Sequence, residues 1–131
     1  MPQITPTIDE FSRSILIVDD DRIIVQLLSA IFDKYGFRVF EASDGLEGWH
    51  VFNSELIDIV LTDILMPGLT GKELAYRIRK RSPSTKIAVM TGGETEVAAE
   101  LMHNGTADYF FLKPFDIKSV CEMLAAETEA A

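Results

Sequence analysis

Four apolar segments of the sequence each end in residues whose side chains or backbone can do chemistry. These residues are Asp19 and Asp20, then Asp63, then Thr91 and Gly92, and finally Lys113. Carboxylates brought together repel one another, by about 4 kcal/mol for a pair ~4 Å apart at an effective dielectric near 20. A bound cation relieves that repulsion, and an all-oxygen ligand set suits Mg²⁺. The open face of the ion would leave room for an anion.

The same set of residues offers hydrogen-bond donors for that anion. The Lys113 amine, the Thr91 hydroxyl and the backbone N–H of Gly92 could bind its oxygens. A nucleophile, a metal and donors for the equatorial oxygens are the requirements of phosphoryl transfer. Asp63 is the candidate nucleophile, and it would form an acyl phosphate.

Short apolar segments alternate with helical patterns along the whole chain, and this alternation predicts how the chemical residues are positioned. The expected strands are residues 14–18, 37–42, 57–62, 86–90 and 109–112, each followed by a helix. Alternating strands and helices predict a parallel sheet covered on both faces, and right-handed crossovers leave few topologies. The predicted fold is α/β and flavodoxin-like, a (βα)5 unit with strand order 2-1-3-4-5. Strands one and three are then neighbours, so Asp19 and Asp20 should face Asp63.

The helices are expected to begin at recognisable caps and to bury one apolar face each. Asp21 is the expected cap of the first helix, and Thr70 with Glu73 forms a capping box. Helical spacing predicts the residues that face the core. They are Ile23, Ile24, Leu27, Leu28, Ile31 and Tyr35 on the first helix, Leu46, Trp49 and Phe52 on the second, and Val97, Ala98, Leu101 and Met102 on the fourth.

Composition bounds the class of protein. The 131 residues suit one domain, and 47% apolar residues are too many for a disordered chain. The net charge of −9 argues against direct nucleic-acid binding. No apolar run is long enough to span a membrane, no signal peptide is visible, and the single Cys121 excludes an internal disulfide. We therefore expect a cytoplasmic domain at residues 14–127, with a flexible arm at 1–13 and a tail at 128–131.

Four strings of residues carry a resemblance to a known family. ILIVDDD, DIVLTDILMPG, IAVMTGG and FFLKPF occur in an order and spacing that resemble the receiver domain of two-component response regulators, over about residues 14–126. The resemblance implies Asp63 as the phospho-acceptor, and Asp19 and Asp20 as Mg²⁺ ligands beside Asp63 and the backbone carbonyl of Leu65. It also implies Thr91 as the switch hydroxyl, Lys113 as the phosphate-pairing lysine, and a cis bond before Pro114.

The resemblance also implies partners and a way of signalling. A sensor histidine kinase or a phosphotransfer protein would donate the phosphoryl group, so the domain catalyses only its own phosphorylation and slow dephosphorylation. A downstream protein would read the fourth helix, the fifth strand and the fifth helix, and a phosphorylation-dependent dimer is left open. If residue 131 is the end of the chain, the expectation is a stand-alone receiver.

Two positions depart from the family pattern. The switch aromatic three residues before the lysine is Phe110, which has no hydroxyl, and Tyr109 stands next to it. We favour Phe110 and keep Tyr109 as the alternative. The residues two positions after the acceptor and the switch threonine are Leu65 and Gly93, and neither side chain can position a water. Our hypothesis is that the acyl phosphate therefore hydrolyses slowly.

Two other functions are kept as alternatives. A haloacid-dehalogenase-like phosphatase also uses an Asp nucleophile with Mg²⁺, and Asp19 and Asp21 match its D-x-D pattern, although that reading leaves Asp63 unused. A flavin-binding module could share the fold. The loop after the first strand is acidic, however, and would repel the flavin phosphate.

Overall fold

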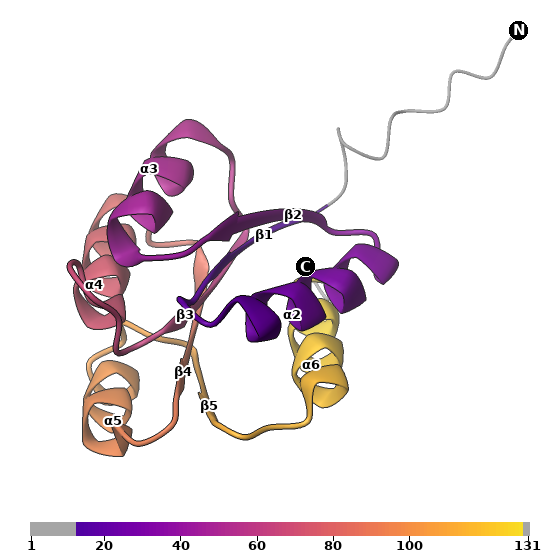
Figure 1. Ribbon diagram of the computed structural model, residues 1–131. Coiled ribbons are helices and arrows are strands. Elements are labelled where there is room, and N and C mark those ends of the chain that lie inside the picture. The colour runs from indigo at the N-terminus through magenta and orange to yellow at the C-terminus, as the bar shows by residue number, and fades with distance from the viewer. Residues whose placement is uncertain (1–12, 130–131) are drawn as a thin grey trace, which may run out of the picture.

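A single parallel sheet forms the centre of the protein. The computed structural model describes residues 13–129, so most of the predicted arm and the last two residues of the predicted tail lie outside the described residues. The strands are β1 (Ser14–Val18), β2 (Arg38–Ala42), β3 (Ile59–Asp63), β4 (Lys86–Thr91) and β5 (Tyr109–Leu112). Their order is β2-β1-β3-β4-β5, with every pair parallel (Figure 1). The predicted fold and strand order are confirmed.

Helices cover both faces of the sheet, as Figure 1 shows. They are α2 (Arg22–Lys34), α3 (Gly45–Ser54), α4 (Gly71–Arg81), α5 (Thr95–His103) and α6 (Ile117–Glu129). One apolar cluster lies between the sheet and α3, α4 and α5, and a second lies under α2 and α6. Strands β1 and β3 are buried along their whole length, because both of their faces are covered.

The register of β1 and β3 positions the ends of these strands. Val18 pairs with Thr62, so the residues that follow, Asp19 and Asp63, leave the sheet at the same edge. The neighbouring pair of Asp63 with Met90 brings the end of β4 to that edge as well. The polar residues at the ends of these parallel strands therefore lie at one edge of the sheet, which is where open α/β sheets bind their ligands.

Side-chain caps hold the helix ends as predicted. The Asp21 carboxylate accepts hydrogen bonds from the backbone N–H groups of Ile23 and Ile24, at 3.0 and 3.4 Å. Thr70 and Glu73 form the capping box at the start of α4. These caps satisfy N–H groups that have no partner within the helix.

The predicted inward faces of three helices were partly wrong. On α2 the buried residues are Val25, Leu28 and Phe32, whereas Ile23 is 68% exposed and Leu27 48% exposed. Leu46 on α3 and Met102 on α5 were also expected inside, and both are exposed. Each of these helices carries more apolar residues than its buried stripe can hold, so periodicity alone could not locate the edge of that stripe.

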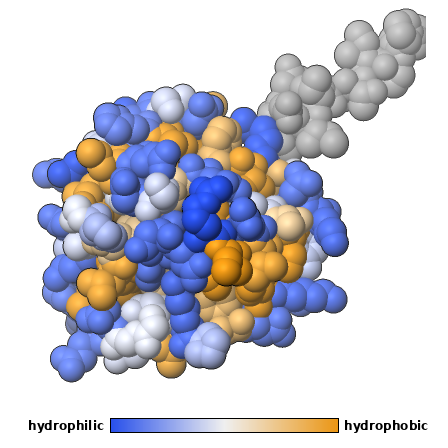
Figure 2. All heavy atoms as spheres, viewed as in Figure 1, coloured by the Kyte–Doolittle hydropathy of each residue, from blue (hydrophilic) through white to orange (hydrophobic). Residues whose placement is uncertain are grey.

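The ends of the domain differ from the predicted boundaries by a few residues. Arg13, the last residue of the predicted arm, donates a 2.6 Å hydrogen bond to the carbonyl of Ala125 and lies over the Phe37 ring. Helix α6 continues to Glu129, two residues beyond the predicted end of the domain. Figure 2 shows hydrophilic and hydrophobic residues mixed over the visible face. Among the described residues, no helix is long and apolar enough to cross a membrane.

A substitution at Gly71 tests how tightly helix α4 packs on the sheet. Its N–H donates a 2.8 Å hydrogen bond to the carbonyl of Ile64, and a Cβ at this position would collide with the carbonyl of Asp63. We expect Gly71→Ala to lower the free energy of unfolding by about 3 kcal/mol, because backbone must shift to admit the methyl group. Urea unfolding measures the change. The control is Gly93→Ala, where a Cβ meets nothing within 4 Å; an equal loss there would contradict the explanation.

Candidate functional site

Three carboxylates form a cluster at the carboxyl edge of the sheet. One oxygen from each of Asp19, Asp20 and Asp63 lies within 4.8 Å of the others. Asp19 is fully buried and Asp63 nearly so, while Asp20 is exposed to solvent. Asp21, the fourth acid of the region, is turned away to cap α2. The oxygen donors and the one open side fit a hard divalent cation such as Mg²⁺.

Lys113 supplies the positive charge that faces this cluster. Its Nζ lies 2.7 Å from Oδ2 of Asp19 and 3.6 Å from Oδ2 of Asp63. Burial alone would lower the pKa of Lys113, but the hydrogen bond and charge of Asp19 outweigh it and raise the pKa. The lysine therefore stays charged, held between two carboxylates that come from β1 and β3.

Asp63 is the acid with the most unfavourable charge. Burial, followed by the charge of Asp19, raises the pKa of Asp63 to about 6 from its ordinary 3.8. Lys113 and the backbone N–H of Ile64 act in the opposite direction without cancelling these effects. At neutral pH the carboxylate is ionised but poorly stabilised, so a bound cation that offsets its charge is favoured.

Thr91 lies beside Asp63, in a pocket of about 300 Å³ that opens at the sheet edge. Leu65, Gly92, Gly93, Glu94 and Lys113 also line this pocket. The Thr91 hydroxyl oxygen accepts hydrogen bonds from the N–H groups of Gly93 and Glu94, at 3.1 and 2.8 Å. Thr91 thus organises the loop that leads into α5.

The two candidate switch aromatics lie on opposite faces of the sheet. Phe110 packs against the apolar cluster under α3, α4 and α5, and it is half-buried. Tyr109 packs on the other face, where its ring is stacked on that of Phe111 at 6.4 Å. Only Phe110 lies on the side of the sheet that α5 covers, which favours it over Tyr109 for a role coupled to that helix.

Sequence reasoning brought the site residues together but missed how they pair with one another. The short contact between Lys113 and Asp19 joins residues at opposite ends of the chain, and no local pattern signals it. Glu94 was also missed as a pocket residue, although its position just after Thr91, Gly92 and Gly93 was a usable signal. The Lys113–Pro114 peptide bond is cis, as the resemblance implied.

Comparison with known proteins agrees with this geometry. Residues 15–125 match the sequence model of the response regulator receiver domain. The sporulation initiation phosphotransferase F of Bacillus subtilis (strain 168) is 34% identical over 110 residues, which are 83% of this chain and 88% of that protein. The chain spans only 22–43% of several other curated relatives, including the regulatory protein AtoC of Escherichia coli (strain K12).

Solved structures give the same result. A CheY-like receiver domain protein from Methanospirillum hungatei JF-1 superposes with a TM-score of 0.83 at 28% identity, covering 91% of this chain and 95% of that one. The response regulator TrrA from Thermotoga maritima, solved in complex with Mg²⁺–BeF, gives 0.77 at 31% identity, covering 87% and 97%. The chain belongs to the receiver domain family of two-component response regulators.

Proposed function

We propose that this receiver domain takes a phosphoryl group onto Asp63 and changes a protein-binding surface in response. The observation that carries the proposal is the position of the Asp63 carboxylate, which lies within 4.8 Å of two other acids and 3.6 Å from the Lys113 amine. A carboxylate that is destabilised by burial and like charge, and that opens onto a pocket with donors, is suited to act as a nucleophile.

Each residue of the site has a part in the transfer. An oxygen of Asp63 forms a bond to phosphorus while the bond from phosphorus to the donor's histidine nitrogen breaks. Lys113, already within reach, pairs with a phosphoryl oxygen, and the Gly92 N–H lies at the pocket to donate to another. Asp19, Asp20, Asp63 and the carbonyl of Leu65 would hold Mg²⁺, which neutralises charge on the transferring group when it is bound. The related TrrA was solved with Mg²⁺–BeF.

The switch begins at Thr91. In the resting structure its hydroxyl oxygen is occupied by the N–H groups of Gly93 and Glu94, so turning toward a phosphoryl group breaks these contacts and frees the loop before α5. Phe110 follows on the same face of the sheet. The surface that changes comprises α5, β5 and α6, where Met102, Leu112 and Met123 are exposed and available to a target or to a second copy.

The phosphodonor needs a surface beside Asp63. A pocket of about 500 Å³ is lined by Ile24 of α2 together with Lys113, Pro114 and Phe115 among others. An apolar surface next to the phosphate-pairing lysine suits docking of a histidine kinase or a phosphotransfer protein. These partners, and a location in the cytoplasm, belong to the same proposal.

The two alternatives gain no support. A haloacid-dehalogenase-like phosphatase needs its D-x-D pair to act together, but Asp21 caps α2 while Asp19 lies in the carboxylate cluster. For a flavin, the loop after β1 still presents carboxylates to the phosphate.

Phosphorylation can be tested with acetyl phosphate and Mg²⁺ on the whole chain. We expect a mass increase of one phosphoryl group, absent in Asp63→Asn and reduced at least ~10-fold in rate in Lys113→Ala, because the amine stabilises the transferring charge. Intact-protein mass spectrometry makes the measurement. Labelling that survives in Asp63→Asn but disappears in Asp19→Asn would overturn the assignment in favour of the phosphatase reading.

The lifetime of the acyl phosphate depends on whether any side chain orients the attacking water. Leu65 and Gly93 cannot do so, and we expect a half-life longer than about a minute, since a water-positioning residue is missing. Leu65→Gln should shorten it several-fold by supplying an amide at the pocket. If the phosphoryl group on the protein without substitutions has a half-life below a minute, measured by loss of the added mass, this hypothesis is wrong.

The electrostatics of Asp63 predict a pH-dependent stability. Because the folded-state pKa of about 6 is above the ordinary 3.8, Asp63 favours the fold most below pH 4, and this contribution is lost as pH rises through 6. Without Mg²⁺, Asp63→Asn should therefore raise the free energy of unfolding at pH 7.5 by up to about 2 kcal/mol and leave it unchanged near pH 4. Urea unfolding at both pH values checks this; stabilisation of the same size at pH 4 would exclude the charge as its cause.

A further inference from the structure

Basic residues are concentrated in one short part of this acidic protein. Residues 72–86 hold six of the twelve lysines and arginines and only one acid, Glu73, in a chain with a net charge of −9. Two of the six have intramolecular ion pairs: Lys72 with Glu100 at 3.5 Å, and Arg79 with Asp108 at 2.7 Å. Within the described residues, Arg77, Lys80 and Arg81 have no ion pair, and all three are exposed.

Helix stability explains only part of this concentration. Basic residues in the last turn of a helix are favoured by its dipole, and Arg79, Lys80 and Arg81 stand in the last turn of α4. Arg77 stands one turn earlier and stacks over the ring of Trp49 on α3, 5.6 Å from its centroid. Arg77 therefore lies beside a half-buried aromatic of the neighbouring helix.

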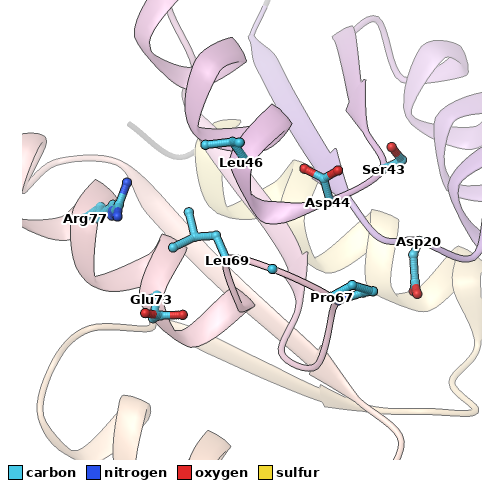
Figure 3. Close-up of a pocket in the computed structure, with 9 residues that line it drawn as sticks. Asp20, Ser43, Asp44, Leu46, Pro67, Leu69, Glu73 and Arg77 are labelled. Carbon is cyan, nitrogen blue, oxygen red and sulfur yellow. The ribbon is translucent and has the colours of Figure 1, made fainter.

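Exposed apolar residues lie next to these charges, between α3 and α4. Leu46 on α3 is 54% exposed, and together with Leu69 it lines a pocket of about 610 Å³ that Arg77 and Asp20 also border. Figure 3 shows the side chains of Leu46 and Leu69 close together, with Arg77 toward one end of the pocket and Asp20 toward the other. The sequence predicted Leu46 to be buried, so its exposure is not explained by the core.

A second depression lies toward the other end of the two helices. One turn beyond Trp49 and Arg77 are Asn53 and Arg81, which border this depression of about 300 Å³ next to Leu56. Leu56 is 85% exposed. The surface between the two helices, which we call the α3–α4 groove, is separate from the α5, β5 and α6 surface and is defined by Leu46, Leu69 and Arg77 at one pocket, Trp49 beside Arg77, and Arg81 at the other pocket.

We propose that the α3–α4 groove binds an acidic amphipathic helix of a partner protein. Tryptophan and arginine are enriched at the centres of protein interfaces, and a helix laid in a groove presents apolar side chains at helical spacing. The charges of Arg77, Lys80 and Arg81 select glutamates or aspartates beside those apolar residues.

A protein fits this groove better than a nucleic acid does. Asp44 and Glu73, together with Asp20, border the pocket that Leu46 and Leu69 line. These three acids would repel a phosphate backbone laid along the groove. A peptide helix can match both ends, because it can carry acids opposite Arg77 and Arg81 and a basic or neutral residue opposite Asp20. Asp20, at the acidic end of the groove, also belongs to the carboxylate cluster.

Trp49 makes the test direct, because it is the only tryptophan in the chain and it lies in the groove. We would titrate the whole protein with three amphipathic helical peptides of about 20 residues that share one leucine stripe and differ only in carrying Glu, Gln or Lys beside it. Trp49 fluorescence should change on binding, and the Glu peptide should bind at least about tenfold tighter than the Gln and Lys peptides at low salt.

Two double variants distinguish binding at the α3–α4 groove from a general effect of the charge of the protein. Lys80→Gln/Arg81→Gln leaves the Trp49–Arg77 contact intact and should weaken the Glu peptide about tenfold or more. Lys34→Gln/Lys118→Gln removes the same charge from exposed sites on α2 and α6 and should bind as the unmodified protein does. Equal affinities for the three peptides, no binding by any of them, equal loss in both double variants, or tighter binding to duplex DNA would overturn the proposal.

Discussion

The mutual repulsion of carboxylates at one edge of the sheet is the constraint on which the rest of the site depends. The pairing of β1 with β3 leaves Asp19 buried and places Asp63 beside it, so the fold itself creates an unfavourable charge. Burial and then the charge of Asp19 raise the pKa of Asp63, while Lys113 and the backbone N–H of Ile64 act in the opposite direction. Lys113 is nearer to Asp19 than to Asp63. A cation bound by these carboxylates would relieve their repulsion, whereas a phosphoryl group on Asp63 would add negative charge and draw on Lys113 and Thr91. Stability is thus given up at the residue that we propose as the phospho-acceptor.

The resting site is also held by contacts that phosphorylation would have to break. Lys113 donates a hydrogen bond to Asp19. The Thr91 hydroxyl oxygen accepts hydrogen bonds from the N–H groups of Gly93 and Glu94, which precede α5. The Thr91 contacts are modest, about 1 kcal/mol for a neutral hydrogen bond, and the Lys113–Asp19 ion pair joins two charged groups that belong to the same site. A new dianionic group can therefore redirect them without unfolding the neighbouring elements. Under the proposed function, a shift of this loop would change the surface formed by α5, β5 and α6.

Helix α4 connects this site with the second surface inferred here. Its first residue, Gly71, rests against the carbonyl of Asp63, and its later turns carry Arg77, Lys80 and Arg81 along the α3–α4 groove. A rigid helix seated on the acceptor strand transmits small displacements of that strand. A partner in the groove would thus be sensitive to the state of Asp63, and Asp63 to the presence of the partner, as thermodynamic linkage requires.

The sequence by itself determined the fold, the strand order and the convergence of Asp19, Asp20, Asp63, Thr91 and Lys113 on one edge, because these follow from local periodicity and from the parallel topology that it implies. The caps at Asp21 and Thr70 were equally local. Only the tertiary structure decided which apolar residues leave the core, since Ile23, Leu27 and Leu46 have the right period but lie beyond the buried stripe. It also decided that Phe110 and Tyr109 occupy opposite faces and that Lys113 pairs with Asp19. Those outcomes depend on contacts between residues distant along the chain, which no local pattern records.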